Sequence, residues 1–299
     1  LNIPIIPRGA GTGLTGGAIG KGIVVDMARY NKEIWDLNRD DQTVWVGPGV
    51  VLDALNEYLK PFGLCFGPDV ATSSRATLGG MIGNNSSGAR CLIYKTTADQ
   101  LLSLEMVLSN GEMADVGNGK SPMGLSFLPF LDEQIEKRSG FIRERFSEPI
   151  YKRWPGYGLE HYLRTKNPAH LISGSEGTLA IFTGAKLKLA PLPKSKALAV
   201  ILFDRVIEAM QATVEIMGIK PAAVEHIDRP LFDQTRNQPA FAQVRSMLEL
   251  DEHPCESLLL VEFYDDVQEK MEALVQKKLG KRTLLFYGDE EMEIGRAHV

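Results

Sequence analysis

Short apolar runs separated by glycine-rich turns dominate the first part of the chain and predict a strand-rich domain. These runs have the length and β-branched content of strands, and one of them closes on Asp26. Val51–Leu59 has leucines at helical spacing instead, and Pro61 and Gly63 follow it as stop signals. We therefore expect a helix over Val51–Leu59 and strands over Ile3–Ile6, Gly22–Met27 and Thr43–Gly47.

The middle of the chain is predicted to contain one β-hairpin and a long surface excursion. Asn110-Gly111 lies between the apolar runs Leu101–Leu108 and Glu112–Val116, and Asn-Gly favours a tight hairpin turn. From Gly117 to Tyr162, charged and aromatic residues interrupt the helical patterns, which favours a solvated surface segment. Strand character then returns from Leu171 through Leu189. The basic residues of the excursion are Arg138, Arg143, Arg145, Lys152 and Arg153.

Beyond Pro191 and Pro193 the pattern changes to alternating strands and helices, which indicates a second domain. Such alternation suits a compact α+β domain with its helices on one side of a sheet. We place the boundary so that the domains cover residues 1–192 and 193–299. The expected elements of the second domain are a strand over Leu198–Phe203, a helix over Val206–Gly218, a short strand, a helix over Pro230–Thr235, a strand over Ser257–Tyr264 and a helix over Val267–Leu279.

Composition and charge narrow the class of protein. The chain has 299 residues, 44% of them hydrophobic and 24% charged, as in globular proteins of two domains. A net charge of −5 gives no electrostatic case for binding nucleic acid or an anionic membrane. No apolar run has the length of a membrane span, and the three spaced cysteines (Cys65, Cys91 and Cys255) favour reduced thiols in the cytoplasm. Both ends look cut, so we expect a fragment of a longer protein.

The stretch Arg8–Gly17, RGAGTGLTGG, is the first candidate for a functional site. Five of its ten residues are glycine, and glycine lets a ligand approach the main chain without an intervening Cβ. Exposed backbone N–H groups in such a loop form an anion site, and Arg8 adds positive charge beside it. A tight structural turn is the alternative interpretation. We expect a phosphate or pyrophosphate ligand.

Two common phosphate-binding motifs do not explain this loop. Gly11, Gly13 and Gly16 fit G-x-G-x-x-G, but only Gly17–Lys21 separate the loop from the next predicted strand. A Rossmann unit needs a crossover helix at that place, and no helix fits there. The Gly-Lys-Ser/Thr of a P-loop is also missing. The loop therefore belongs to another fold.

Five motifs in order resemble the flavin-binding half of the vanillyl-alcohol oxidase and p-cresol methylhydroxylase superfamily. The motifs are IPIIPRGAGTGLTGG (Ile3–Gly17), GPGV (Gly47–Val50), FGPD (Phe66–Asp69), ATLGGMIGNNSSGAR (Ala76–Arg90) and GSEGTL (Gly174–Leu179). The chain is most similar to the FAD-linked D-2-hydroxyacid dehydrogenases, namely the glycolate oxidase flavoprotein subunit, D-lactate dehydrogenase and D-2-hydroxyglutarate dehydrogenase. EHIDRPLFDQTR (Glu225–Arg236) and LLLVEFY (Leu258–Tyr264) resemble the cap of the large members that carry an added iron–sulfur region.

The resemblance implies an α+β fold: a PCMH-type FAD-binding domain, truncated at its N-terminus, followed by an incomplete ferredoxin-like cap. It also implies FAD as cofactor, with the first glycine loop around the pyrophosphate. The alternative for Thr77–Ser87 is a structural loop whose hydrogen bonds are made by its own Asn and Ser side chains. By this resemblance the FAD-binding residues are Arg8, Gly9, Ala10, Gly11, Thr12, Gly13, Leu14, Gly17, Pro68, Asp69, Thr77, Gly80, Gly83, Asn84, Ser86, Ser87, Gly88, Glu176, Gly177 and Ile181.

Three departures from the family pattern refine these expectations. The first loop has no histidine, so FAD is expected to be bound non-covalently. Lys95 stands where the family often has glycine, within Tyr94–Thr97, and either contacts or blocks the cofactor. The histidine-rich catalytic motif of the hydroxyacid enzymes is absent, so no catalytic residue is assigned. The histidines present (His161, His170, His226, His253 and His298) are scattered, and we predict no metal site.

The implied reaction is oxidation of a D-2-hydroxy acid to the 2-oxo acid, with hydride passing to flavin N5 and electrons to a separate acceptor. His226, beside Glu225, is the best single candidate for catalysis, although a structural role is favoured. Arg229 and Arg236 suit a carboxylate clamp, with salt bridges as the favoured alternative. Oxidation of another alcohol or a phenol, or a non-catalytic flavin- or nucleotide-binding module, are the competing functions.

Overall fold

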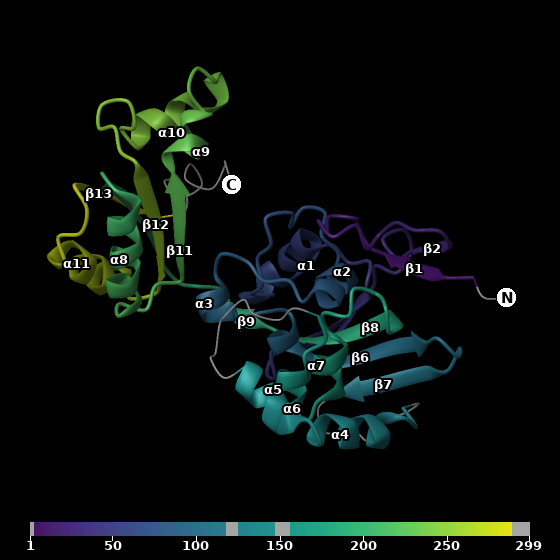
Figure 1. Ribbon diagram of the computed structural model, residues 1–299. Coiled ribbons are helices and arrows are strands. Elements are labelled where there is room, and N and C mark those ends of the chain that lie inside the picture. The colour runs from purple at the N-terminus through teal and green to yellow at the C-terminus, as the bar shows by residue number, and fades with distance from the viewer. Residues whose placement is uncertain (1–2, 118–124, 147–155, 289–299) are drawn as a thin grey trace. The chain divides into compact units, whose positions relative to one another are not determined.

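The computed structural model describes residues 3–117, 125–146 and 156–288 of the chain. The chain divides into two compact units, Leu1–Leu192 and Pro193–Val299 (Figure 1). Within the described residues, no helix combines the length and the apolar character needed to cross a membrane. The secondary structure is mixed helix and strand in both units, as expected for an α+β fold.

An antiparallel five-stranded sheet forms the centre of the first unit. Its order is β3-β4-β8-β6-β7. The strands are β3 (Ile34–Asn38), β4 (Thr43–Val46), β6 (Leu101–Leu108), β7 (Met113–Gly117) and β8 (Ala180–Lys188). The predicted hairpin is confirmed, because β6 pairs with β7 and Gly111 in their turn has a φ of +84°. The strand β3 is absent from the sequence prediction; its short apolar run is interrupted by Asp36, at a φ of +49°.

Side chains alternate between the two faces of this sheet, so one face forms the core. Leu104 and Met106 of β6 and Leu187 of β8 are fully buried, whereas Glu105 and Lys186 between them are half-exposed. Two helices supply further core residues: α1 (Leu52–Leu59), as predicted, and α2 (Leu78–Asn84).

Smaller elements complete the first unit. A parallel pair joins β1 (Ile5–Arg8) to β2 (Ile23–Asp26), and an antiparallel pair joins β5 (Leu64–Cys65) to β9 (Ala190–Pro191). The first strand therefore begins later than predicted and runs directly into Gly9. A short helix α3 (Cys91–Tyr94) follows the motif that ends at Arg90, and 3-10 turns occupy Lys60–Phe62 and Ala98–Gln100.

The predicted surface excursion is a small helical cluster with its own core. It comprises α4 (Leu128–Glu136), α5 (Ser139–Arg145), α6 (Leu159–Thr165) and α7 (Pro168–Ile172). Its arginines are exposed as expected, whereas Ile135, Ile142 and Tyr162 are buried together.

The strand predicted from Leu171 is wrong over its first part, because α7 and a turn precede β8. Pro168 at the first helical position and the Asn167 cap explain that helix, since Asn167 Oδ1 accepts from Ala169 N at 3.0 Å. Lys152 and Arg153 lie outside the described residues.

Two histidines that are separated in the sequence meet inside this cluster. The rings of His161 and His170 lie 4.1 Å apart between centroids, and both side chains are buried. Burial and the neighbouring His170 lower the pKa of His161 to about 3, and burial also lowers the pKa of His170. Both imidazoles are therefore neutral near pH 7.

The second unit has a four-stranded antiparallel sheet of order β11-β12-β10-β13. With helices after the first and third strands, this is the ferredoxin-like arrangement that the resemblance implied. The chain runs through β10 (Lys196–Phe203), α8 (Val206–Met217), β11 (Ala223–Asp228), α9 (Arg229–Asp233), a 3-10 turn (Pro239–Phe241), α10 (Ala242–Met247), β12 (Ser257–Tyr264), α11 (Val267–Gln276) and β13 (Arg282–Tyr287). The strand β13 and the helix α10 are absent from the sequence prediction.

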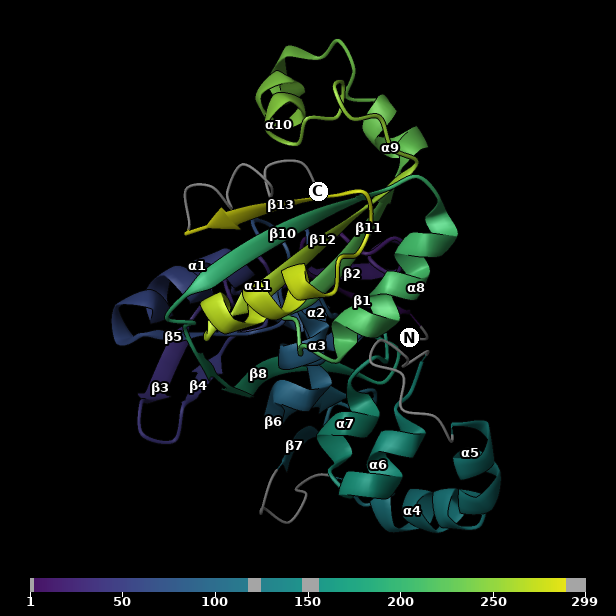
Figure 2. The ribbon, with the colours of Figure 1, turned by 90° about the vertical axis from the view of Figure 1, so that its left-hand side faces the viewer.

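Each face of this sheet has its own core. The helices α8 and α11 pack on one face through Ala209, Ala212 and Met271 (Figure 2). The predicted one-sided arrangement is wrong for the helix predicted over Pro230–Thr235, because Phe232 packs into the core of the other face. The segment between β11 and β12 contributes Phe232 and Leu248 to the other face. Arg245 of α10 is buried there, where it forms an ion pair with Asp251 and donates to the Phe232 carbonyl at 2.8 Å.

Replacing Lys95 with glycine is expected to stabilise the first unit. Lys95 follows α3 with φ +59° and ψ −145°, a conformation that strains any residue with a Cβ. Lys95→Gly removes that strain at an entropic cost in the unfolded chain, so we expect a net gain of about 1 kcal/mol. Denaturant unfolding measures it. Lys220→Gly, at an ordinary left-handed φ of +57°, is the control and should gain less; equal gains would contradict the strain at Lys95.

Stability is expected to fall as the pH drops below about 6.5, because of the two buried histidines. The unfolded chain protonates histidine near pH 6.5, whereas folded His161 stays neutral down to a pKa of about 3. Between these values the unfolded state binds more protons, so the free energy of unfolding decreases with decreasing pH. His161→Phe should reduce that slope between pH 5 and 6.5, where few carboxylates titrate. Equal slopes for the wild type and His161→Phe would contradict the assignment.

Candidate cofactor-binding site

A cavity of about 360 Å³ lies within the first unit. Three segments far apart in the sequence form its walls: the glycine loop after β1, the α2 helix with its flanking residues, and the turn before β8. Its size is within the range of small-molecule sites, roughly 300–1,000 Å³. The cavity is therefore the first place to look for a ligand.

Close backbone packing fixes the start of the glycine loop. The parallel pairing of β1 and β2 continues as Met27 N donates to the Arg8 carbonyl at 2.9 Å. A Cβ added to Gly9 would lie 2.1 Å from Thr77 Oγ1, so only glycine fits between β1 and α2. Gly11, at a φ of +72°, turns the chain back against the Arg8 guanidinium. Arg8 is thus held beside the exposed backbone of its own loop.

The α2 helix was hidden in the sequence by its glycines, which disfavour helix formation. Tertiary contacts stabilise it instead. Leu78, Met81 and Ile82 are buried in the core, and a Cβ added to Gly79 would lie 2.5 Å from Pro48 Cβ. Gly79 thus packs against the GPGV turn, and all three glycines of the helix, Gly79, Gly80 and Gly83, line the cavity.

The turn at Glu176 closes the other side of the cavity. Glu176 N donates to the Gly83 carbonyl at 2.8 Å, which ties this turn to the end of α2. The Glu176 carboxylate accepts from Asn84 Nδ2 at 2.7 Å, and Ser86 Oγ donates to Asn84 Oδ1 at 3.0 Å. Glu176 itself has a φ of +52°, so the turn holds a non-glycine residue in the left-handed region. A continuous polar chain from Ser86 to Glu176 therefore follows this wall.

The cavity combines a charged end with an apolar lining. Arg8 and Glu176 are the only charged residues among the described residues that line it, and they have opposite signs. Met27, Met81 and Phe182 contribute apolar surface. Such a cavity suits a ligand that has both an anionic group and a flat apolar ring system.

Most of the residues predicted to bind FAD are brought together here. Those that line the cavity are Arg8, Gly9, Ala10, Gly11, Thr12, Gly13, Leu14, Gly17, Thr77, Gly80, Gly83, Asn84, Ser86, Ser87, Glu176 and Gly177. Pro68, Asp69, Gly88 and Ile181 are not among the lining residues. Ile181 alternates along β8 with Ala180 and Phe182, which do line the cavity, so its side chain lies on the other face of the strand.

The site prediction left out lining residues both inside the quoted motifs and outside them. They are Pro7, Thr15, Ala18, Met27, Pro48, Val70, Thr72, Ala76, Gly79, Met81, Ala180 and Phe182. Most carry apolar or small side chains, which have no chemical signature in a sequence. Pro48 and Met81 lie inside quoted motifs, so the motifs that contain them could have placed them in the predicted site. Phe182 belongs to no quoted motif, and only the position of β8 in the sheet brings it to the cavity.

Two observations test whether a flavin nucleotide suits these walls. Thr77 Oγ1 is buried without a hydrogen-bond partner at the junction of the glycine loop and α2, and buried hydroxyls are normally paired. The cradle is lined by glycines, and Gly13 has no atom within 4 Å of an added Cβ. A hydroxyl that is free to donate and open space beside bare backbone fit a phosphate-bearing ligand.

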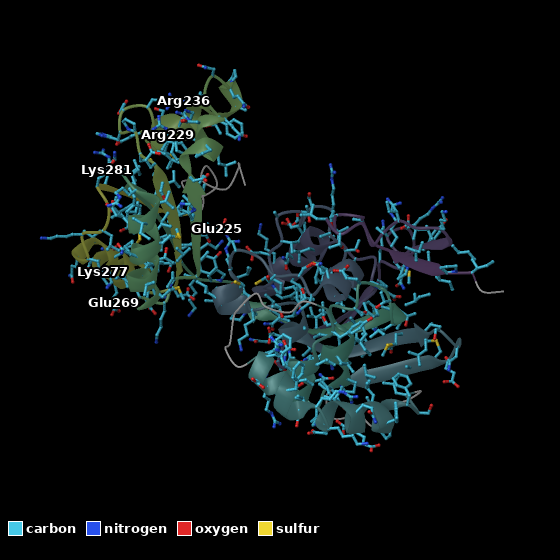
Figure 3. The ribbon with its side chains drawn as sticks, viewed as in Figure 1. Glu225, Arg229, Arg236, Glu269, Lys277 and Lys281 are labelled. Carbon is cyan, nitrogen blue, oxygen red and sulfur yellow. The ribbon has the colours of Figure 1, made fainter. Side chains whose placement is uncertain are left out.

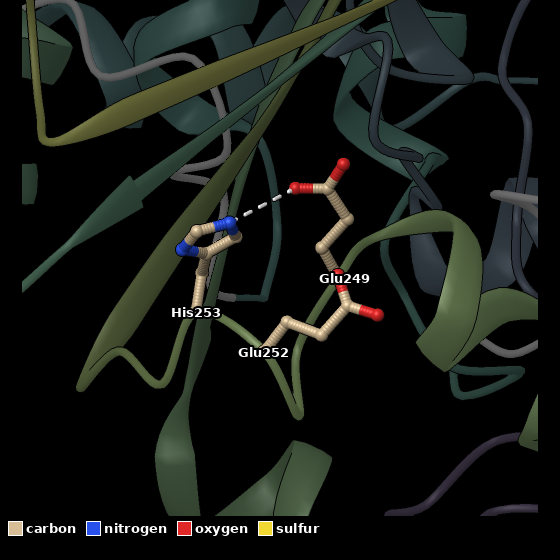
Figure 4. Close-up of side chains that lie close together, drawn as sticks. All are labelled: Glu249, Glu252 and His253. Atoms are coloured by element: carbon tan, nitrogen blue, oxygen red, sulfur yellow. Dashed lines mark ion pairs between the residues drawn. The ribbon is translucent and has the colours of Figure 1, made fainter.

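Other candidate groups in the described chain are already engaged in structural contacts. Glu249, Glu252 and His253 could supply three metal ligands (Figure 4). However, Glu249 forms ion pairs with His253 at 3.5 Å and with Arg282, so a guanidinium already occupies the side where a cation would bind. We interpret the group as an ion-pair network that joins the α10 segment to β13.

Arg229 and Arg236, which were considered as a carboxylate clamp, form salt bridges, and this confirms the favoured alternative. Figure 3 labels both arginines, in the segment that follows β11. Arg229 pairs with Asp233 and Glu256, and Arg236 pairs with Asp233 at 2.8 Å. His226 is exposed on β11, and its Nε2 lies 2.8 Å from Ser257 Oγ. These contacts account for the residues without a ligand.

Comparison with protein families identifies both units. Residues 1–117 match the family described as "FAD binding domain", and residues 192–293 match "FAD linked oxidases, C-terminal domain". The expectation of FAD as the cofactor is thereby confirmed.

Curated relatives share sequence along most of the chain. A D-2-hydroxyglutarate dehydrogenase of Pantoea ananatis is 34% identical over 276 residues, which cover 87% of this chain and 27% of the relative. The enzyme of that name from Escherichia coli is 31% identical, over 90% of this chain and 28% of its own length. The glycolate oxidase subunit GlcD of Bacillus subtilis is 31% identical, over 76% and 41%. The chain thus spans less than half the length of these relatives.

A solved structure titled alkyldihydroxyacetonephosphate synthase has the same fold, with a TM-score of 0.69. It is 19% identical, and the match covers 99% of this chain and 50% of that one. Because residues 1–117 carry the FAD binding domain and residues 192–293 carry the C-terminal domain of FAD linked oxidases, the chain has the two-domain composition of an FAD-linked oxidase, consistent with the vanillyl-alcohol oxidase and p-cresol methylhydroxylase superfamily.

Proposed function

We propose that this protein is an FAD-dependent dehydrogenase that oxidises a D-2-hydroxy acid to the corresponding 2-oxo acid. The observation that carries the proposal is the cavity itself: a glycine cradle with one arginine, in a domain of the FAD-binding family. The relatives named above, D-2-hydroxyglutarate dehydrogenases and a glycolate oxidase subunit, support this substrate class. The candidate substrates are therefore acids of the glycolate, D-lactate or D-2-hydroxyglutarate type.

Different residues of the cavity would bind different parts of FAD. The bare backbone of the glycine loop and the Arg8 guanidinium would hold the pyrophosphate. Thr77, Ser86 and Asn84 offer neutral donors and acceptors to the polar atoms of the cofactor. No histidine or cysteine is among the described lining residues, which supports non-covalent binding. When bound, FAD supplies the oxidising power for removal of a hydride from the alcohol carbon.

Proton transfer is assigned outside this cavity. The only carboxylate among the described lining residues is Glu176, which accepts a hydrogen bond from Asn84 and serves the wall of the site. We place the base that takes the hydroxyl proton on a residue beyond the lining set. Electrons then leave to a separate acceptor, for which an iron–sulfur region or subunit is a chemically suitable choice.

We also propose a cytoplasmic location. All three cysteines are present as buried thiols, and burial raises the pKa of the Cys255 thiol, which keeps it protonated. Unoxidised thiols are typical of a reducing compartment.

Gly13→Val is expected to weaken FAD binding without unfolding the protein. Gly13 lines the cavity, and an added Cβ there meets no protein atom within 4 Å, so valine fits the protein but adds bulk to backbone that the cofactor would approach. We expect the FAD dissociation constant to rise by at least roughly tenfold, in line with losing about 1.4 kcal/mol or more of binding energy. Flavin fluorescence quenching measures it.

Gly140→Val is the matched control for that experiment. Gly140 lies in α5, also has nothing within 4 Å of an added Cβ, and is not among the cavity residues. Its FAD dissociation constant should equal that of the wild type. If both variants bind FAD as tightly as the wild type, the cofactor does not occupy the glycine-lined cavity.

Anaerobic reduction of the bound flavin tests the substrate class. In the whole protein, D-2-hydroxyglutarate, D-lactate or glycolate should bleach the flavin absorbance, and the L-enantiomers of the chiral acids should do so much more slowly. Simple alcohols and phenols are the comparison substrates. Bleaching by those alone would indicate a different oxidase, and retained flavin that no substrate reduces would indicate a non-catalytic flavin-binding module.

A further inference from the structure

A contact behind the cavity wall involves residues that were expected to bind FAD but do not line the cavity. Asp69 and Gly88 each stand next to lining residues in the chain: Val70 follows Asp69, and Ser86 and Ser87 precede Gly88. Two wall segments from different parts of the sequence therefore meet at this point. The geometry gives these residues a role other than touching the ligand.

Asp69 binds the far end of the Ser86–Arg90 segment in three ways. Its carboxylate forms an ion pair with the Arg90 guanidinium, and it accepts from Arg90 N at 3.3 Å. The backbone of Gly88 packs so closely on Asp69 that an added Cβ would lie 2.0 Å from the Asp69 carbonyl oxygen. The Arg90 side chain is only 14% exposed and that of Asp69 is 27% exposed, so water screens the ion pair weakly.

The near end of the same segment is tied down independently. Ser86 N donates to the Met81 carbonyl at 2.9 Å, at the end of α2. The Ser86 carbonyl accepts from Thr97 N at 2.9 Å and from Thr97 Oγ1 at 2.7 Å. Thr97 is itself fully buried. Between these bonds and Asp69, the two serines have little freedom to move away from the cavity.

We propose that Asp69 and Arg90 are positioning residues that form a clasp, which holds Ser86 and Ser87 against the cofactor cavity. The clasp rests on the proposed function for the identity of the ligand that it serves. Asp69 acts through the Ser86–Arg90 segment, and the bound cofactor contacts the serines and not the Asp69 carboxylate.

The first measurement is amide hydrogen exchange in the chain without cofactor, for Asp69→Asn, Arg90→Gln and the double variant. The amides of Ser86–Arg90 should exchange about tenfold faster in each single variant than in the wild type, because the segment opens locally. Exchange in β6 and β8, in the centre of the sheet, should stay unchanged. Arg90→Lys keeps the charge and should restore most of the protection.

The second measurement is titration of the same variants with FAD. Each single variant should raise the dissociation constant about tenfold, and the double variant should raise it no further, since both substitutions break one contact. Lys166→Gln is the control. Lys166 forms exposed ion pairs with Asp132 and Glu136 in the same unit, away from the cavity residues, and its loss should leave FAD binding unchanged.

The outcomes separate the clasp from the proposed function. Wild-type exchange rates at Ser86–Arg90 in both single variants, or effects on FAD binding that multiply in the double variant, would overturn the clasp. A fall in protection across the whole first unit would reduce Asp69 and Arg90 to ordinary stabilising residues and would also overturn it. If the wild-type protein binds no FAD, the proposed function fails, while the exchange rates still decide whether the clasp exists.

Discussion

Close packing of glycine backbone at and around α2 is the constraint on which the rest of the first unit depends. Gly9 admits the Thr77 side chain, and Gly79 admits Pro48, so the glycine loop and the GPGV turn both press against one short helix. A Cβ at either position would push these segments apart. The residues of this contact line the cavity together with Gly80 and Gly83. Its shape is therefore set by packing before any ligand binds.

The polar groups of the site are organised by the same packing. Asn85 ends α2 in the left-handed region at φ +52°, and its side chain accepts from Ala98 N at 2.9 Å. The chain turns sharply at Asn85 and continues into Ser86 and Ser87, which line the cavity. The turn at Glu176 then bonds back to the helix end through Gly83. Thr77 Oγ1, which lines the cavity, is left without a hydrogen-bond partner, as are Asn85 Nδ2 and Ser175 Oγ, whose chain neighbours Asn84 and Glu176 line it.

The second unit follows from a different principle, the alternation of strand and helix around an antiparallel sheet. Its two cores lie on opposite faces of β10 and β12, and the α9–α10 insertion supplies the residues of one of them. The many charges of that insertion form ion pairs with one another. Arg245 is the extreme case, because it is buried and has a carboxylate and a carbonyl as partners. Charge in this segment therefore stabilises local structure.

The sequence by itself determined the flavin motifs, the α1 helix, the β6–β7 hairpin and most elements of the second unit, because each depends on local periodicity or turn chemistry. It also brought the glycine loop, Thr77 and Glu176 into one prediction, although through family resemblance. Only the tertiary structure decided that glycine-rich Leu78–Asn84 is a helix, that His161 meets His170, and that Asp69 lies behind the cavity wall. Those outcomes depend on which segments pack together, and burial and close contact outweigh the propensities that a local pattern reports.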